Sequence, residues 1–133
     1  MADGRTGEDA DFGVGKVDGE HRLQLGLLVA LRDALGAAQA AAEIDEILDR
    51  LTDFSKVHFV SEELLMRLYQ YPDYEAHVAD HERMVEELDA LRRGGDGLTV
   101  EALDTLKTSL VGHIARADRT LHDYLARLSA ASV

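Results

Sequence analysis

The chain has 133 residues, the length of a single domain with one hydrophobic core. Its 26 acidic residues against 14 Lys and Arg give a formal charge of −12, which argues against nucleic acid and anionic membranes as partners. Cysteine is absent, so disulfides, thiolate metal sites and thiol catalysis are excluded. The N-terminus lacks the features of a secretory signal, and no apolar stretch has the length of a membrane span. We therefore expect a cytoplasmic protein, either a monomer or a weak oligomer.

The composition favours helices over strands. The chain has one Pro, 46% hydrophobic residues and only 5% aromatic residues, whereas strands are rich in β-branched and aromatic residues. Residues 1–16 are rich in Gly and Asp and show no helical period, so we expect an N-terminal arm there. Residues 17–133 are expected to form one domain.

Four apolar stripes with helical spacing follow the arm. Asp18 is the expected N-cap of the first helix, which fades after about residue 36. The other stripes predict helices over about residues 44–69, 74–93 and 99–128, separated by Tyr71-Pro72 and by a Gly-rich loop. Amphipathic helices joined by short loops predict an all-α fold, an up-down-up-down antiparallel four-helix bundle.

Ionisable residues interrupt every stripe. Burying such groups without partners costs several kcal/mol, on the order of the whole stability of a domain, so something must compensate for them. Their presence on all four helices indicates a shared site in the core. The interrupting residues are His21, His58, Glu62, His77, His81, His113 and Asp118.

The spacing of these residues predicts how they meet. His58 with Glu62, and His77 with His81, are four residues apart and therefore lie one turn apart on one helix face. Asp118 follows His113 by five residues, about 140° away on an ideal helix. Both reach one site only if they flank it or if a π-bulge brings them together, and these two arrangements stay open.

The set of five imidazoles and two carboxylates is typical of a metal centre. Two carboxylates can bridge two metals, and five imidazoles divide as three plus two, which leaves one metal with an open position. Imidazole and carboxylate ligands in a helical bundle favour iron or manganese over a closed structural zinc site.

The full pattern resembles the hemerythrin family, particularly the bacterial single-domain hemerythrins, from about residue 13 to the end. It consists of Asp18-x-x-His21, His58-Phe59-x-x-Glu62-Glu63, Met66 followed by Tyr71-Pro72, His77-x-x-x-His81 and His113-x-x-x-x-Asp118.

The resemblance implies a cofactor of two iron ions in an oxo- or hydroxo-bridged di-iron centre. It implies one iron held by three histidines, His77, His81 and His113, and a second iron held by His21 and His58. Glu62 and Asp118 would bridge them, and dioxygen would bind at the two-histidine iron. Three apolar residues next to ligands are then the expected walls of a dry ligand pocket: Phe59, Leu110 and Ile114.

Gln24 departs from the family pattern, which usually has an apolar residue three positions after the first ligand histidine. The amide either points toward the two-histidine iron and hydrogen-bonds a ligand, or lies on the flank of the stripe and reaches solvent. The chain also lacks the Trp that the family's arm usually supplies, and Phe12 is the nearest aromatic residue. His122 is expected to be an interhelical edge residue or a neighbour of the ligands.

The leading functional hypothesis is reversible dioxygen binding for carriage, storage or delivery. The alternative is an enzyme, a di-iron peroxidase or nitric oxide reductase using the same open iron, which Gln24 and the missing Trp favour. A third hypothesis is an oxygen or redox sensor module. Peroxide and nitric oxide are thus the alternative small ligands to dioxygen.

Overall fold

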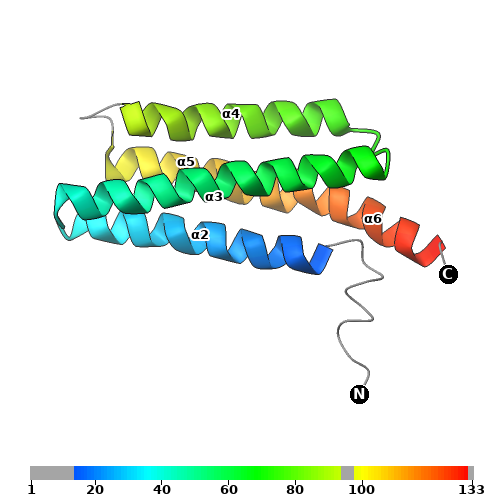
Figure 1. The fold of residues 1–133 in the computed structure, drawn as a ribbon, viewed down its shortest axis with the longest axis horizontal. Coiled ribbons are helices and arrows are strands. Elements are labelled where there is room, and N and C mark those ends of the chain that lie inside the picture. Colours follow the sequence, from blue (N-terminus) through cyan, green and yellow to red (C-terminus); the bar gives the residue numbers. More distant parts are fainter. Residues whose placement is uncertain (1–13, 94–97, 132–133) are drawn as a thin grey trace, which may run out of the picture.

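The computed structural model describes residues 14–93 and 98–131. These residues form an antiparallel bundle of four helical rods (Figure 1). Helix α2 packs on α3 and α5, and α4 also packs on α3 and α5, so the rods enclose a central core. The predicted all-α four-helix bundle is confirmed. The helices are α2 (Val14–Gly36), α3 (Ala41–Leu68), α4 (Tyr74–Arg93), α5 (Val100–His113) and α6 (Arg119–Ala131), with the π-helix η2 (Ile114–Asp118) joining the last two.

Two helix ends follow local sequence signals. Thr99 caps α5, because its hydroxyl accepts a hydrogen bond from the backbone N–H of Ala102. Helix α3 ends at Leu68, and Gln70 takes a positive φ of 53° in the turn before Tyr71. The predicted end of this helix before Tyr71-Pro72 is therefore confirmed.

The predicted start of the first helix is wrong. Helix α2 begins at Val14, four residues before Asp18, so Asp18 lies inside the helix and is not its N-cap. An N-cap contributes only about 1 kcal/mol, which is a weak determinant of where a long helix begins. Most of the predicted arm, together with Phe12, lies outside the described residues.

Two apolar clusters fill the core, and a polar layer separates them. Along α3, Glu62 lies between Phe59 of the larger cluster and Met66 of the smaller one. The fourth rod repeats this order, since the segment from His113 to Asp118 lies between Leu110 and Leu121. The apolar stripes thus hold both ends of the bundle together and position the polar residues between them.

The π-helix η2 decides between the two arrangements expected for His113 and Asp118. Its five residues, Ile114–Asp118, insert one extra residue into the fourth rod. This brings Asp118 back to the inner face that carries His113, and both side chains are buried. The π-bulge is therefore the arrangement that this chain adopts.

None of the helices in residues 14–93 and 98–131 is both long enough and apolar enough to cross a membrane.

Candidate metal centre

All seven ionisable residues that interrupt the stripes meet in the polar layer. All are buried, and they come from four rods: His21 from α2, two from α3, two from α4, and two from the last rod. We call them the seven-residue cluster. Their donor atoms form two overlapping groups, each within 4.8 Å, that share both carboxylates. One group is Glu62, His77, His81, His113 and Asp118, and the other is His21, His58, Glu62 and Asp118.

Glu62 faces the two groups with different oxygen atoms. Its Oε2 lies 3.3 Å from Nε2 of His21 and 3.3 Å from Nε2 of His58. Its Oε1 lies 3.1 Å from Nε2 of His77 and 3.0 Å from Nε2 of His81. The carboxylate therefore stands between a two-histidine side and a three-histidine side.

Asp118 repeats this division. Its Oδ2 lies 2.8 Å from Nε2 of His21, on the two-histidine side. Its Oδ1 lies 2.9 Å from Nε2 of His77 and 3.0 Å from Nε2 of His113, on the three-histidine side. Each carboxylate thus presents one oxygen to each side, as a group that bridges two cations would.

Three further carboxylates hold the outer nitrogens of the histidines. Nδ1–H of His58 donates to Glu20 at 2.7 Å. The corresponding contacts of the other two histidines are 2.9 Å from His81 to Glu63 and 2.6 Å from His113 to Asp80. A proton held on Nδ1 leaves the Nε2 lone pair free to bind a cation, and the carboxylate fixes the ring orientation. We call Glu20, Glu63 and Asp80 the outer carboxylates.

The outer carboxylates follow a rule along the chain. Glu20, Glu63 and Asp80 are each the sequence neighbour of a cluster residue, yet each binds a histidine on the next rod. One step along a helix turns the side chain by about 100°, from the centre of the bundle toward the adjacent helix. From its position one residue after Glu62, Glu63 is expected either to be solvated or to hydrogen-bond a ligand, and the structure shows the second arrangement. The roles of Glu20 and Asp80 were not predicted. The acidic residues next to His21, Glu62 and His81 were the available signal.

The electrostatics of the cluster keep its carboxylates ionised. Burial alone would raise the pKa of Glu62 and Asp118, but the histidine Nε2 atoms close to their oxygens hold both pKa values below the usual range. Burial alone would lower the pKa of His21 and His77, but their contacts with Asp118 and Glu62 raise both to about 9. Without a cation, protonated histidines therefore neutralise the buried carboxylates.

The hydrogen bonding inside the cluster is incomplete, which is the pattern expected of metal ligands. Among the described residues, Nε2 of His58, Nε2 of His113 and both Asp118 oxygens are buried and have no hydrogen bond of acceptable geometry. Leaving such groups unpaired costs about 1–3 kcal/mol each. Imidazole and carboxylate donors around one buried point suit a divalent transition metal, so the residues fit the predicted cofactor.

Phe59, one of the expected pocket walls, lies beside histidines of both sides, because its ring centroid is also 5.7 Å from that of His58. The ring of Phe59 stacks on His81 with centroids 4.3 Å apart, and meets His113 edge-on at 6.3 Å. Phe59 and Leu110 line a narrow cavity of about 10 Å³ inside the bundle. Ile114 is half-buried and packs against the larger cluster, but it does not line that cavity.

Gln24 is also in this cavity. Its side chain is only 1% exposed, so the alternative that places it in solvent is wrong. His122 is half-buried and its ring stacks on His21, with centroids 5.7 Å apart. It is thus a neighbour of the cluster.

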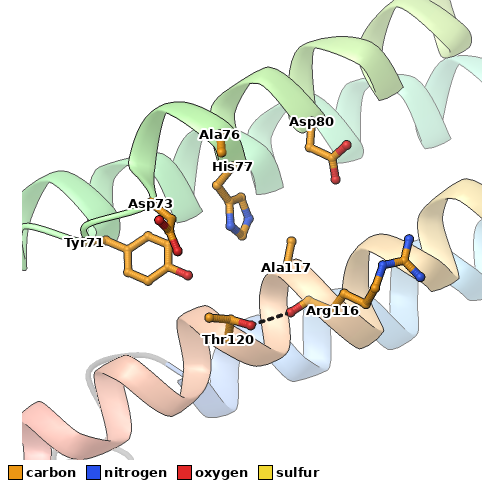
Figure 2. Close-up of a pocket in the computed structure, with 8 residues that line it drawn as sticks. All are labelled: Tyr71, Asp73, Ala76, His77, Asp80, Arg116, Ala117 and Thr120. Atoms are coloured by element: carbon orange, nitrogen blue, oxygen red, sulfur yellow. Dashed lines mark hydrogen bonds between the residues drawn. The ribbon is translucent and has the colours of Figure 1, made fainter.

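A second pocket reaches His77 from the outside of the bundle. It has a volume of about 290 Å³, and Figure 2 shows His77 between Tyr71 and Asp80. Arg116 and Thr120 come from the opposite rod, where the Thr120 hydroxyl donates to the Arg116 carbonyl at 2.9 Å. The three-histidine side therefore has an approach from the surface that is separate from the inner cavity.

Comparison with known proteins gives one family. Residues 13–125 match the family model of the hemerythrin HHE cation binding domain. A bacteriohemerythrin of Methylococcus capsulatus is 31% identical over 116 residues, which cover 83% of this chain and 88% of that protein. A bacteriohemerythrin of Stenotrophomonas maltophilia is 29% identical over 119 residues, covering 87% of this chain and 77% of the relative. No solved structure shows significant similarity.

Proposed function

Because this chain belongs to the hemerythrin HHE cation-binding family, we propose that its seven-residue cluster holds two iron ions and that the protein binds dioxygen reversibly. His77, His81 and His113 would bind one iron, and His21 and His58 would bind the other. Glu62 and Asp118 would bind both.

The division of the carboxylate oxygens is the observation that carries this proposal. Glu62 and Asp118 each turn one oxygen to the two-histidine side and the other to the three-histidine side. A single metal would not require this division. Because only two histidines serve one side, a metal held there would have an open position for an exogenous ligand, which a closed structural site lacks.

The bound iron pair would supply electrons to dioxygen at the open position and recover them when the gas leaves. The chain's own residues do the rest. The outer carboxylates hold the Nδ1 protons and the ring orientations of His58, His81 and His113. Phe59 and Leu110 present apolar surface around the inner cavity, which restricts the entry of water.

The burial of Gln24 favours a second candidate function, the turnover of hydrogen peroxide or nitric oxide at the same centre. A stable oxygen carrier needs an apolar ligand pocket. Polar groups in the pocket assist protonation of the bound ligand, and the protonated ligand then leaves without returning its electrons to the metal. An amide in the inner cavity departs from that requirement. The two functions share the cluster and differ in the fate of the ligand.

The test is to count iron per chain and then record visible absorption as air is admitted to the reduced protein and removed by argon. We expect two irons per chain and an absorption band that appears with air and disappears under argon. The Glu62→Ala variant should lose most of its iron, whereas Glu101→Ala, on the exposed side of α5, should keep both. A spectrum that argon does not reverse would contradict reversible binding and favour the second function.

A further inference from the structure

An apolar stripe lies on the outer face of α3. The described part of the chain has seven large apolar side chains that are exposed, and four of them lie within twelve residues of this helix. Single exposed apolar residues are common on protein surfaces, whereas a contiguous group of them marks an interaction site. The four are Val57, Val60, Leu64 and Leu68, which are 66%, 61%, 48% and 63% exposed, and we call them the α3 stripe.

The spacing of the stripe is that of a helix–helix seam. Val57, Val60 and Leu64 follow one another at steps of three and four residues, as the apolar residues of a coiled coil do. They lie on the side of α3 away from its core residues His58 and Glu62. In Figure 1, α3 lies in front of α5, so this side of the helix faces out of the bundle. The stripe is therefore a helix face prepared for a partner.

The charges around the stripe differ from those of the whole chain. Residues 50–68 contain three basic and three acidic residues, whereas the chain has a formal charge of −12. Asp53 lies one turn before the stripe, and Arg67 lies at its other end. In the described part of the chain, neither of these two residues takes part in an ion pair, and Arg67 donates only to the Tyr74 hydroxyl at 3.2 Å. A second copy of this chain offers each of them the opposite charge.

These two charges favour an antiparallel arrangement of two copies. A two-fold axis between Val60 and Leu64 brings Val60 of each copy against Leu64 of the other, and Val57 against Leu68. Asp53 of one copy and Arg67 of the other are then about 6 Å apart along the helix, within reach of an arginine side chain. A parallel arrangement would instead bring Asp53 against Asp53.

A groove beside the stripe gives a second copy room to pack. It lies between α3 and α4 and has a volume of about 420 Å³. Phe59, Val60 and Val85 form its apolar lining. Residues 1–13 of the same chain are less suited to cover this surface, because they contain four acidic residues and only two large apolar ones.

We propose that two copies of this chain form a weak antiparallel dimer through the α3 stripe, with Asp53 of each copy paired to Arg67 of the other. The stripe is only about 17 Å long, so the contact is smaller than a standard protein interface. A dissociation constant of about 10 µM to 1 mM is therefore expected. The dimer does not depend on the proposed function, because each copy holds a complete seven-residue cluster.

The first test is sedimentation equilibrium of the full-length protein from about 10 µM to 1 mM, with enough salt to screen the net charge of the two copies. We expect a dimer at the upper end of this range. Val60→Glu buries an unpaired charge at the contact and should weaken the dimer at least about tenfold. Val29→Glu, on the exposed side of α2, is the matched control and should have no effect. A protein that stays monomeric, or a dimer that both variants leave intact, would overturn the inference.

The second test exchanges the two charges. Asp53→Arg or Arg67→Asp alone should weaken the dimer by roughly tenfold, because each change turns two attractive pairs into repulsive ones. The two changes together restore opposite charges and should restore the dimer. Circular dichroism verifies that all three variants keep the helicity of the parent. A double variant as weak as the single ones would contradict the pairing.

The third test uses the absence of cysteine from the chain, which allows disulfide trapping with single-cysteine variants. In the antiparallel dimer, Val60→Cys and Leu64→Cys should cross-link to each other in a mixture faster than either cross-links to itself. Faster self-linking of each variant would indicate a parallel dimer and overturn the proposed arrangement.

Discussion

Replacing Asp80 by Asn tests whether the outer carboxylates control the centre. Asp80 accepts the Nδ1–H of His113 at 2.6 Å, the shortest of the three outer contacts, and its side chain is 31% exposed. Asn keeps the size and an acceptor oxygen but removes the charge. The histidine then becomes a weaker donor to the metal, and the ring is held less firmly.

The magnitude follows from the exposure of Asp80. A hydrogen bond to a charged group contributes about 1.5–3 kcal/mol, and contact with solvent places this one at the lower end. A loss of about 1.5 kcal/mol corresponds to a decrease in metal affinity of roughly tenfold. Mutating a residue that supports a metal ligand typically lowers metal affinity by about ten- to a hundredfold, so this decrease lies at the lower end of that range.

The assay is competition for zinc or ferrous iron with a chromophoric chelator at constant pH. Asp104→Asn is the matched control, because Asp104 also makes a 2.7 Å contact, but with Arg32 on the surface and away from the cluster. We expect weaker metal binding only in Asp80→Asn. Equal affinities for the two variants would refute the role assigned to the outer carboxylates.

Three more predictions concern protons, packing and the π-helix. The pKa values of His21 and His77 are about 9 in the metal-free protein, so metal binding must displace one proton from each. Because two protons are displaced, metal affinity measured by chelator competition should rise between pH 7 and 9 by up to about 100-fold per pH unit. The same raised pKa values stabilise the metal-free fold, and this contribution to the free energy of unfolding is complete below pH 6.5. Denaturant titrations should show the contribution disappearing as the pH rises through 9. Leu31→Ala, in the larger apolar cluster, should lower the free energy of unfolding by about 2–5 kcal/mol in urea titrations. Deleting exposed Ala115 from η2 should convert the π-helix to an α-helix and preserve helicity and cooperative melting, and a variant that no longer melts cooperatively would contradict this account of the extra residue.

Sequence spacing alone predicted only part of the arrangement of the seven-residue cluster. His58 with Glu62, and His77 with His81, could be placed on common helix faces because four residues make about one turn. The five-residue step from His113 to Asp118 could not be resolved in this way. A π-turn interrupts the regular i to i+4 hydrogen bonds of the helix and is therefore unfavourable by itself. The packing of Leu110 and Leu121 in the two apolar clusters on either side favours it in this chain.

The sequence by itself determined the fold class, the four stripes, and the seven residues that belong in the core, because helical period and the cost of buried charge act locally. Tertiary structure alone decided the pairings between rods. Glu20 and Asp80 bind histidines 38 and 33 residues away, and Gln24 is buried by its contact with Ser55, 31 residues away. The start of α2 at Val14 was likewise beyond local reasoning, since a cap preference of about 1 kcal/mol does not fix the end of a helix packed along its length. The contacts of residues that face a neighbouring helix depend on how the helices pack, so they can be identified only in the folded structure.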